Sequence, residues 1–327
     1  MAYDVVVIGS GPGGYVAAIR AAQLGFKTGI IEKESLGGIC LNWGCIPTKA
    51  LLQSAQVIEY IKHAQDFGIE ASGQQNFPAV IKRSRGVADK MSKGVQFLMR
   101  KNKIDVIMGF GKITGKGKIE VTGADNSKQT VEAKHIIIAT GGRSRQLPTM
   151  PVDGKKIIGY REAMVLPEQP KSMIVVGSGA IGVEFGYFYN SMGTKVTIVE
   201  FMPRVVPVED EEISKELEKN FRKSGIDIMV NAEVTKVDTS GNGVRATVKT
   251  ATGEQVLEAD VLLSAVGVQA NLEGIGLEEM GIKVEKGRIA VDKWSRTNVE
   301  GFYAIGDCSP GAALAHVASK EAIICVE

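Results

Sequence analysis

Two closely spaced cysteines are the most chemically reactive feature of this sequence. Cys40 and Cys45 lie five residues apart in the segment 37–49, GGICLNWGCIPTK, and the chain has only four cysteines. Paired thiols of this kind bind metals, form structural cross-links or exchange disulfides with a substrate. The surrounding residues, and the elements that must hold the pair, favour one of these uses over the others.

A metal site is disfavoured by the supply of ligands. Structural zinc sites need four ligands at suitable spacings, whereas Cys308 and Cys325 lie far along the chain and the three histidines are scattered through it. Two inert core thiols are a commoner alternative than metal ligands. The glycines around Cys40, and Pro47 just after Cys45, make a poor core segment, which favours a reactive pair.

Helix geometry sets a condition on any bond between the two sulfurs. In an ideal helix, Cα atoms five residues apart are separated by about 8.6 Å, whereas a disulfide needs less than about 7 Å. A bridge therefore requires that the segment not be regular helix through both cysteines. Gly44 allows a distorted turn, and Pro47 suits the first turn of a helix that begins nearby. Closing so short a loop would stabilise the fold by only about 2 kcal/mol, so reactivity explains the pair better than stapling.

The expected helix start gives the two sulfurs different chemistry. Cys45 would lie at a helix N-terminus, where the positive end of the helix dipole favours the thiolate. Cys40 would lie on the preceding loop, where a substrate thiol can reach it. One accessible, exchanging sulfur beside one stabilised sulfur is suited to thiol–disulfide exchange.

Two copies of one glycine-rich pattern organise much of the remaining chain. Each copy has an apolar strand, a G-x-G-x-x-G turn, a helical pattern and a second strand that ends in glutamate. The glutamate follows the first glycine by the same number of residues in both copies. The residues are Gly9, Gly11, Gly14 and Glu32 in the first copy, and Gly177, Gly179, Gly182 and Glu200 in the second.

This context is typical of dinucleotide binding. The first glycine allows a tight turn, the second lets backbone approach a pyrophosphate, and the third lets the helix pack on the strand. Amides at the helix N-terminus bind the phosphates, and Glu32 and Glu200 can accept hydrogen bonds from ribose hydroxyls. At the second site, Glu200 would repel a 2′-phosphate and residues 201–203 offer no cation, which favours NAD over NADP. Arg204 is the nearest cation that could weaken this preference.

The pattern predicts an α/β fold of two nested Rossmann-like dinucleotide-binding domains. Buried strands are expected at 136–139, 261–266 and 302–305, and helices at 48–64 and 77–101. The predicted domain boundaries divide the chain into 1–147, 148–270 and 271–327, with the last segment returning to the first domain. Ligands in such sheets bind beyond the carboxyl ends of strands. The residues found there are Thr140, Gly141, Gly267 and Asp307.

Composition and charge disfavour several classes of partner. The 327 residues are 44% hydrophobic and 23% charged, with a net charge of +2. These values are ordinary for a globular protein and give no reason to expect nucleic acid or a membrane as a partner. Lys112, Lys116 and Lys118 are interpreted as a solvated hairpin. The N-terminus has no leader pattern and no apolar run reaches spanning length, which predicts a cytoplasmic location.

Taken together, the motifs resemble those of the flavoprotein disulfide reductases. They are CLNWGCIPTKALL at 40–52, GSGPGG at 9–14, ATGG at 139–142, GSGAIGVEFG at 177–186 and AIGD at 304–307. Leu41 and Thr48 resemble the dihydrolipoamide-oxidising branch of this family more than the glutathione-type branch. The resemblance runs from residue 3 to the end of the chain.

The resemblance implies FAD in the domain formed by 1–147 and 271–327, and NAD in the domain at 148–270. It implies that Cys40 is the interchange thiol, that Cys45 is the thiolate against the flavin, and that Lys49 lies near the flavin paired with Glu184. The residues implied for FAD are Gly9, Gly11, Gly14, Glu32, Lys49, Thr140, Gly141, Asp307 and Ala315. Those implied for NAD are Gly177, Gly179, Gly182, Glu200 and Gly267. His316 is interpreted as a packed or capping residue.

The implied activity is that of an oxidoreductase. Dihydrolipoamide would reduce a Cys40–Cys45 disulfide, and FAD would carry the electrons to NAD⁺. The implied partner is the lipoyl domain of a 2-oxo acid dehydrogenase complex, and no metal is implied. Family members are longer, with a C-terminal interface domain that forms a homodimer and supplies a histidine–glutamate pair for the substrate's proton. We therefore expect these 327 residues to bind both cofactors and pass electrons from NADH to dyes, with weak or no dihydrolipoamide turnover.

Two other functions stay open at this point. One is an NADPH-dependent disulfide or mercuric reductase. Comparing NADH with NADPH as reductants of the flavin would distinguish it from an NAD-dependent dihydrolipoamide oxidoreductase. The other is a non-catalytic cofactor-binding or scaffold module that docks to a multienzyme complex. A flavin spectrum with a long-wavelength band after two-electron reduction would favour redox function over that module.

Overall fold

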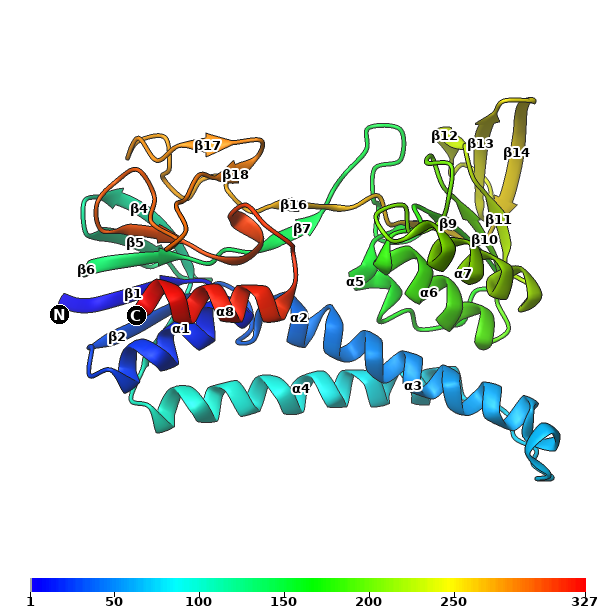
Figure 1. Cartoon of the computed structure of the whole chain (residues 1–327), viewed down its shortest axis with the longest axis horizontal. Coiled ribbons are helices and arrows are strands. Elements are labelled where there is room, and N and C mark those ends of the chain that lie inside the picture. The colour runs from blue at the N-terminus through cyan, green and yellow to red at the C-terminus, as the bar shows by residue number, and fades with distance from the viewer. Residues whose placement is uncertain (1) are drawn as a thin grey trace. The chain divides into compact units, whose positions relative to one another are not determined.

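The computed structural model describes residues 2–327 and divides the chain into two compact units. The first unit contains Met1–Cys45, Ala88–Arg143 and Val268–Glu327, and the second contains Ile46–Val87 and Ser144–Gly267. Each unit is built on its own parallel or largely parallel sheet with helices packed against it (Figure 1).

Seven strands form the sheet of the first unit: β1 (Ala2–Ile8), β2 (Thr28–Glu32), β3 (Asp105–Met108), β4 (Phe110–Gly115), β5 (Lys118–Thr122), β6 (Lys128–Ile138) and β19 (Phe302–Ala304). Their order is β3-β2-β1-β6-β5-β4, and β19 pairs with β6. Strands β3, β2, β1, β6 and β19 are parallel to one another, whereas β5 and β4 add an antiparallel extension. The β4–β5 pair carries Lys112 and Lys118, so the predicted hairpin is confirmed.

The smaller elements of the first unit are α1 (Pro12–Gln23), α2 (Gly38–Asn42), α8 (Ala315–Val326), the short helix η2 (Gly306–Cys308) and the hairpin of β17 (Val284–Glu285) with β18 (Arg288–Ile289). Helices α1 and α8 lie side by side (Figure 1). A Cβ atom at Gly13 would lie only 3.4 Å from the Cβ of Ala318, so small residues permit this close approach. The two segments of the unit that are most distant in sequence thus meet beside the first glycine-rich turn.

Five parallel strands form the larger sheet of the second unit: β8 (Ile157–Ile158), β9 (Ser172–Val176), β10 (Lys195–Val199), β11 (Asp227–Met229) and β15 (Val261–Ser264). Their order is β11-β10-β9-β15-β8. An antiparallel sheet of β12 (Glu233–Asp238), β13 (Val244–Thr250) and β14 (Gly253–Ala259) shares its core, which includes Ile174, Ala246 and Leu262. The other elements are α5 (Tyr160–Ala163), α6 (Ala180–Ser191) and α7 (Glu211–Lys223).

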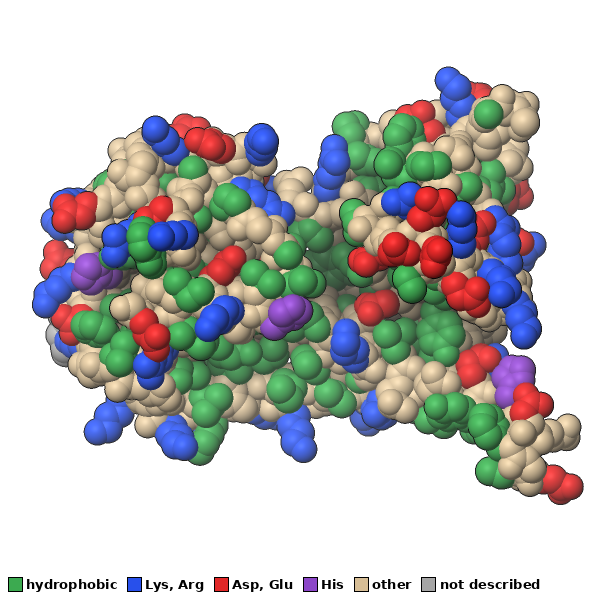
Figure 2. Space-filling model, in the orientation of Figure 1, with side chains coloured by type: hydrophobic (Ala, Val, Ile, Leu, Met, Phe, Trp, Pro, Cys, Tyr) green, Lys and Arg blue, Asp and Glu red, His purple; other side chains and the backbone are tan. Residues whose placement is uncertain are grey.

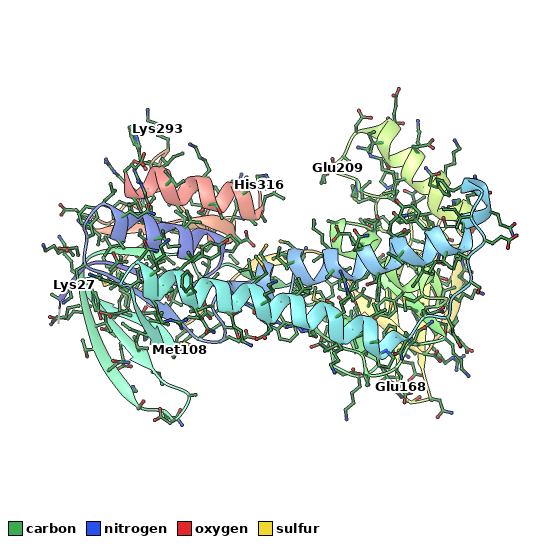
Figure 3. All side chains as sticks on the ribbon, turned by 90° about the horizontal axis from the view of Figure 1, so that it is seen from below. Lys27, Met108, Glu168, Glu209, Lys293 and His316 are labelled. Carbon is green, nitrogen blue, oxygen red and sulfur yellow. The ribbon has the colours of Figure 1, made fainter. Side chains whose placement is uncertain are left out.

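Two long helices, α3 (Cys45–Lys62) and α4 (Phe77–Lys101), run alongside each other in both ribbon views (Figures 1 and 3). Within the second unit, Ser84 Oγ donates to the carbonyl of Pro47 at 2.9 Å and Arg83 Nη1 donates to that of Ala50 at 2.8 Å. The remaining elements are η1 (Ala64–Phe67) and two short strands that pair with each other, β7 (Gly142–Ser144) and β16 (Val268–Ala270).

The predicted α/β fold with two dinucleotide-binding folds is confirmed. Helix α4 has the bounds that the sequence pattern predicts, but α3 begins at Cys45 rather than at residue 48. The earlier start places Pro47 in the first turn of the helix, where its missing N–H leaves no intrahelical bond unmade. Helix α1 likewise has a proline, Pro12, as its first residue.

The charged side chains of both signs are interspersed on the face drawn in Figure 2, as the small net charge leads one to expect. Among residues 2–327, no helix has both the length and the apolar character needed to cross a bilayer.

Candidate active site

The cysteine pair sits on either side of a break between two helices. Helix α2 ends at Asn42, Trp43 leaves helical geometry with φ −138° and ψ 16°, and α3 begins at Cys45. The interruption meets the condition set above for two sulfurs five residues apart. Cys45 opens a helix, as expected. Cys40 does not lie on a loop, as expected, but in the middle of the five-residue helix α2.

The cysteine segment is anchored directly to the first glycine-rich turn. Gly37 and Gly38 have φ values of +101° and +60°, and the amide of Gly37 donates to the carbonyl of Ser10 at 3.0 Å. A Cβ atom at Gly38 would lie 2.6 Å from the Cα of Gly11. The two backbones therefore touch, which places the start of α2 against the turn that precedes α1.

Asn42 fixes the other side of this segment. Its buried amide donates to the carbonyls of Leu36 at 3.0 Å and Gly38 at 2.9 Å, and Ser92 Oγ donates to the same Leu36 carbonyl at 2.8 Å. These bonds satisfy backbone groups that a very short helix leaves without intrahelical partners. Asn42 is a positioning residue that the pattern of the sequence did not single out.

Tyr15 is a second residue that sequence reasoning missed at this site. Burial, and then the charges of Cys40 and Cys45, raise the pKa of Tyr15 above its usual value. The phenol is therefore neutral at physiological pH and lies within electrostatic reach of both sulfurs. It follows Gly14 directly, so only its place in the glycine-rich motif could have drawn attention to it.

Lys49 and Glu184 meet within the second unit, as the resemblance implied. Nζ of Lys49, on α3, lies 3.9 Å from Oε1 of Glu184, on α6. Burial raises the pKa of Glu184, and the positive charge of Lys49 opposes that rise. The Lys49 side chain is itself 68% exposed, so the pair combines a solvated ammonium with a half-buried carboxylate.

In the first glycine-rich turn, two of the three motif glycines leave no room for a side chain, and the third does. A Cβ at Gly9 would lie 2.2 Å from the carbonyl oxygen of Ala139, and one at Gly14 would lie 1.9 Å from that of Gly9. At Gly11, by contrast, a Cβ would meet nothing within 4 Å, and φ is −64°, which any residue can adopt. Open space at the N-cap of α1 fits a ligand whose phosphates approach the backbone there.

The second turn repeats this arrangement. A Cβ at Gly177 would lie 2.4 Å from the carbonyl oxygen of Ala265, and one at Gly182 would lie 1.9 Å from that of Gly177. Gly179, at the N-cap of α6, has φ −68° and nothing within 4 Å of its Cβ position. The residues present therefore fit a second dinucleotide in the same way as the first.

Each acidic residue at the end of the following strand is buried and held by three donors. Glu32 Oε2 accepts from the amide of Ser10 at 3.0 Å and from its hydroxyl at 2.6 Å, while Oε1 accepts from the amide of Glu34 at 2.8 Å. In the second unit, Glu200 Oε2 accepts from both the amide and the hydroxyl of Ser178 at 2.7 Å. Its Oε1 accepts from the amide of Met202 at 2.8 Å.

The turn after β6 is fixed by Asn271. Thr140 Oγ1 donates to the carbonyl of Asn271 at 2.7 Å, and the backbone and side-chain amides of Asn271 donate to the carbonyls of Gly141 and Thr140. Gly141 has φ +67° and no atom within 4 Å of its Cβ position. Gly267 in the second unit has φ +107° and equally open surroundings, so both turns present backbone to open space.

Asp307 lies in η2, immediately after β19. Burial raises the pKa of Asp307, and Arg288 opposes the shift. The amide of Gly306 donates to Oε2 of Glu321, on α8, at 2.7 Å, which ties the turn to that helix. Ala315 is the first residue of α8, and His316 follows it in the same turn (Figure 3).

Arg204 is engaged by its own loop. Its Nη2 donates to the carbonyl of Pro207 at 3.1 Å, and its Nε is buried. The guanidinium that could have favoured a 2′-phosphate thus has a partner within the loop that follows Glu200.

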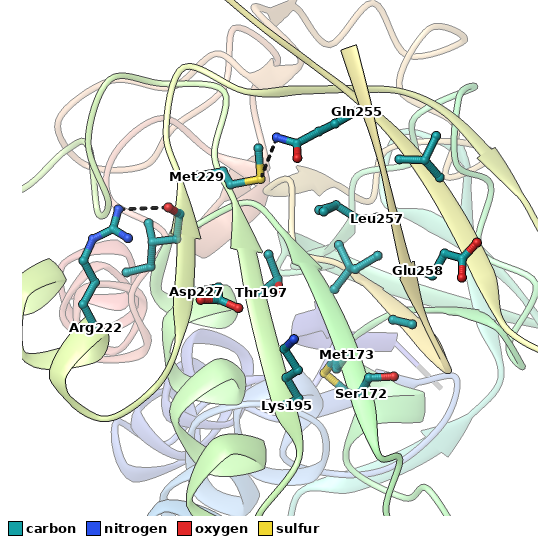
Figure 4. A pocket seen from close by; sticks show the side chains of 14 residues that line it. Ser172, Met173, Lys195, Thr197, Arg222, Asp227, Met229, Gln255, Leu257 and Glu258 are labelled. Carbon is teal, nitrogen blue, oxygen red and sulfur yellow. Dashed lines mark hydrogen bonds between the residues drawn. The ribbon is translucent and has the colours of Figure 1, made fainter. Parts of the chain in front are cut away.

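A separate pocket of about 630 Å³ lies in the second unit (Figure 4). Ser172 and Lys195, which line it, begin β9 and β10, whereas Gly177 and Glu200 follow the ends of those strands. The pocket also includes Met229, at the end of β11, and residues of β14, so it follows the strands and is separate from the second glycine-rich turn, none of whose glycines lines it. Arg222, another lining residue, already donates to the carbonyl of Ile228 at 2.9 Å. Within residues 2–327, no group of three or more His, Cys, Asp or Glu side chains is arranged to hold a metal ion.

Comparison with known proteins agrees with this geometry. The family described as "Pyridine nucleotide-disulphide oxidoreductase" matches residues 3–322. Dihydrolipoyl dehydrogenase from Rhizobium etli is 51% identical over 99% of this chain and 71% of its own length. Dihydrolipoyl dehydrogenase from Chlorobaculum tepidum is 50% identical over 99% of this chain and 70% of its own. The crystal structure of LpdA from Mycobacterium tuberculosis superposes with a TM-score of 0.92 at 31% identity, over 99% of this chain and 72% of that one.

These similarities confirm the class of protein and its cofactors. The predicted flavoprotein disulfide reductase resemblance, the oxidoreductase class, and FAD and NAD(H) as cofactors are confirmed. The chain spans about 70% of the length of these relatives. This chain belongs to the pyridine nucleotide-disulphide oxidoreductase family.

Proposed function

We propose that this chain oxidises dihydrolipoamide through a redox disulfide of Cys40 and Cys45 and delivers the electrons to NAD⁺. The main support is the contact between the cysteine segment and the first dinucleotide turn, where a Cβ at Gly38 would lie 2.6 Å from Gly11 Cα. That contact supports a dithiol close to the cofactor that the first turn is proposed to bind. Relatives named dihydrolipoyl dehydrogenase, up to 51% identical, support the choice of substrate.

The exchange step moves two electrons between sulfur pairs. One substrate thiolate attacks Sγ of Cys40, the Cys40–Cys45 bond breaks, and Cys45 leaves as a thiolate. The second substrate thiolate then attacks the mixed disulfide and releases Cys40. The substrate becomes a cyclic disulfide, and the protein pair is reduced by the same two electrons.

The residues around Cys45 are suited to hold negative charge. Cys45 begins α3, so the amides of the first helical turn and the helix dipole stabilise its thiolate. Lys49 lies one turn further along α3 and brings a cation whose partner is Glu184. When bound, FAD supplies the two-electron redox chemistry that links the thiols to NAD⁺.

We assign FAD to the first unit and NAD to the second. The proposed FAD residues of that unit are Gly9, Gly11, Gly14, Glu32, Thr140, Gly141, Asp307 and Ala315. Lys49 is proposed for FAD from the family resemblance alone. The proposed NAD residues are Gly177, Gly179, Gly182, Glu200 and Gly267. The partner proposed for the substrate is a lipoyl domain of a 2-oxo acid dehydrogenase complex.

Trapping a mixed disulfide tests the roles of the two cysteines without relying on turnover. Oxidised lipoamide added to reduced Cys45→Ser, with iodoacetamide added to cap the freed lipoamide thiol before it recloses the ring, should leave an adduct on Cys40, because no protein thiol remains beside it to expel the substrate. Reduced Cys40→Ser should give much less adduct, since Cys40 is assigned as the thiol that exchanges with the substrate. Intact-mass measurement and peptide mapping identify the modified residue.

Cys325→Ser is the matched control, because this cysteine lies on α8 outside the pair. It should behave as the wild type. Both cysteines of the pair are present in this variant, so no adduct should be trapped. Equal adduct yields on Cys40 and Cys45, or none on either, would contradict the assigned roles. Tighter binding of NADPH than NADH would instead favour the NADPH-dependent alternative.

A further inference from the structure

We infer that Ser10 and Ser178 are positioning residues that orient Glu32 and Glu200 toward the ribose of each dinucleotide. Both serines occupy the second place of their glycine-rich turn, and both are 0% exposed. The inference rests on the proposed cofactor sites and adds a residue to each of them.

The contacts are the same in the two units. In each, the serine hydroxyl donates to Oε2 of the glutamate, at 2.6 Å in the first unit and 2.7 Å in the second. In each, the serine amide also donates to Oε2, and the amide two residues after the glutamate donates to Oε1 at 2.8 Å. The two units share no residues, yet the serine and the glutamate make the same contacts with each other in both.

The protein donors occupy all but one of the acceptor positions on each glutamate carboxylate. An ionised carboxylate offers about four lone-pair positions on its two oxygens. The serine fills both positions on Oε2, and the following amide fills one on Oε1. The position that is left lies on Oε1, so the serine determines which oxygen remains able to accept a hydrogen bond from a ribose hydroxyl.

Burial explains why a hydroxyl is needed for this purpose. Glu32 is 8% exposed and Glu200 is 7% exposed, so neither carboxylate has much water to complete its hydrogen bonds. A buried carboxylate that loses a short charge-assisted donor would rotate or recruit water, and the free acceptor position would no longer be held. Glycine or alanine at the serine position would allow the same backbone turn but would provide no hydroxyl to donate to the carboxylate.

Alanine substitution removes the hydroxyl and keeps the backbone bonds of the junction. In the first unit it also removes a longer contact, which the Ser10 hydroxyl accepts from the amide of Gly37 at 3.3 Å. The carbonyl of Ser10 accepts from the amide of Gly37 at 3.0 Å, and that of Ser178 accepts from the amide of Val206 at 3.0 Å. These backbone bonds, and the serine amide bonds to the glutamates, survive a change to alanine. The side-chain hydroxyl is the group that the substitution removes.

The test compares two matched substitutions in one chain. Ser10→Ala should weaken FAD binding about tenfold and leave NADH binding within twofold, while Ser178→Ala should do the reverse. Apoprotein reconstitution followed by flavin fluorescence gives the first dissociation constant, and NADH fluorescence titration gives the second. Ser127→Ala is the control, because Ser127 Oγ also donates to a carboxylate, that of Asp125 at 2.6 Å, but in an exposed turn. It should change neither constant.

Double-mutant cycles distinguish positioning from a general loss of structure. In the Glu200→Gln background, Ser178→Ala should weaken NADH binding less than twofold, because the serine acts through the carboxylate. The Ser10→Ala and Glu32→Gln pair should show the same non-additivity for FAD. Full additivity in both cycles, or serine variants that bind like the wild type, would overturn the inference. A wild type that binds neither FAD nor NADH would instead overturn the proposed function.

Discussion

Nζ of Lys49 lies 3.9 Å from Oε1 of Glu184, and the carboxylate is the less exposed partner, with its side chain at 34% of full exposure. At this separation the ion pair is loose and is worth little in water. Burial nevertheless raises the pKa of Glu184, since the charge of Lys49 offsets only part of the lost solvation. The pair is therefore better suited to holding charge near a site than to stabilising the fold.

The pKa of Glu184 predicts a specific pH dependence of stability. Because the folded-state pKa is raised above the ordinary 4.5, Glu184 favours folding below about pH 4.5 and loses this contribution as pH rises through the raised value. Glu184→Gln should therefore gain stability relative to the wild type between about pH 4 and about pH 7. Chemical denaturation across this range measures the difference.

Glu273→Gln is the control with the opposite sign. Its hydrogen bond with Arg143 lowers the pKa of Glu273 to about 2, so its contribution is present above about pH 4.5 and is lost as pH falls toward about 2. This variant should be less stable than the wild type at neutral pH and converge with it in acid. If the stability difference from the wild type changed with pH in the same direction for both variants, the assigned causes of the two pKa shifts would be contradicted.

The open glycines should separate ligand binding from folding. At Gly179 an added Cβ meets no protein atom, so Gly179→Ala should cost the apoprotein about 1 kcal/mol or less, the penalty of alanine at an N-cap. The same methyl group occupies space that the pyrophosphate needs, and NADH affinity should fall by about tenfold or more. Thermal unfolding and fluorescence titration give the two values.

The neighbouring glycine supplies the contrast. In Gly182→Ala the new Cβ would lie 1.9 Å from the carbonyl oxygen of Gly177, so the second unit should fail to fold stably. Gly11→Ala and Gly14→Ala should repeat this difference for FAD and the first unit. If Gly179→Ala and Gly182→Ala destabilised the apoprotein equally, both glycines would be required for folding, and Gly179 would not be a glycine required only for ligand binding.

Nucleotide choice should depend on Glu200. Its buried carboxylate is held by three protein donors, and it would repel a 2′-phosphate. Arg204, the cation within residues 201–204, is tied to its own loop by a bond from Nη2 to the carbonyl of Pro207. NADH should bind at least about tenfold more tightly than NADPH, and Glu200→Ala should reduce that ratio mainly by weakening NADH. Glu209→Ala, at an exposed glutamate further along the same loop (Figure 3), should leave the ratio unchanged.

Local pattern was enough to predict most of the architecture. Runs such as 5–8 and 136–138 are β-branched and lead into glycine-containing turns, so strand formation and burial follow from the same residues. Gly14 and Gly182 are required by contacts with the carbonyls of Gly9 and Gly177, within the same strand–turn–helix unit. The strand runs and these contacts are local in sequence, so the sequence pattern alone predicts them. Gly9 and Gly177 are required by the carbonyls of Ala139 and Ala265 from distant strands, so the sequence identifies them only as part of the glycine-rich motif.

Features that depend on tertiary contact were not predictable in this way. Helix α2 has five residues, too few to show a helical period, and it is held by Asn42 and by Ser92 from a distant helix. Cys40 was placed on a loop for this reason. The serine-to-glutamate bonds span the two ends of a strand–helix–strand unit, so they emerge only when the sheet brings those ends together. The Lys49–Glu184 pair came from family resemblance, since 135 residues separate the two.

The four cysteines should differ sharply in reactivity in the folded protein. Cys308 is 0% exposed and burial raises its pKa to about 11, while burial raises the pKa of Cys325 to about 12. At about pH 8, no more than about a thousandth of either thiol is then ionised, and the thiolate is the reactive form. Iodoacetamide added to the reduced, folded protein should label the proposed redox pair, Cys40 and Cys45, and spare both Cys308 and Cys325. Peptide mapping after denaturation should find all four labelled, and rapid labelling of Cys308 before unfolding would show that the core around β6 and β19 opens far more readily than its burial implies.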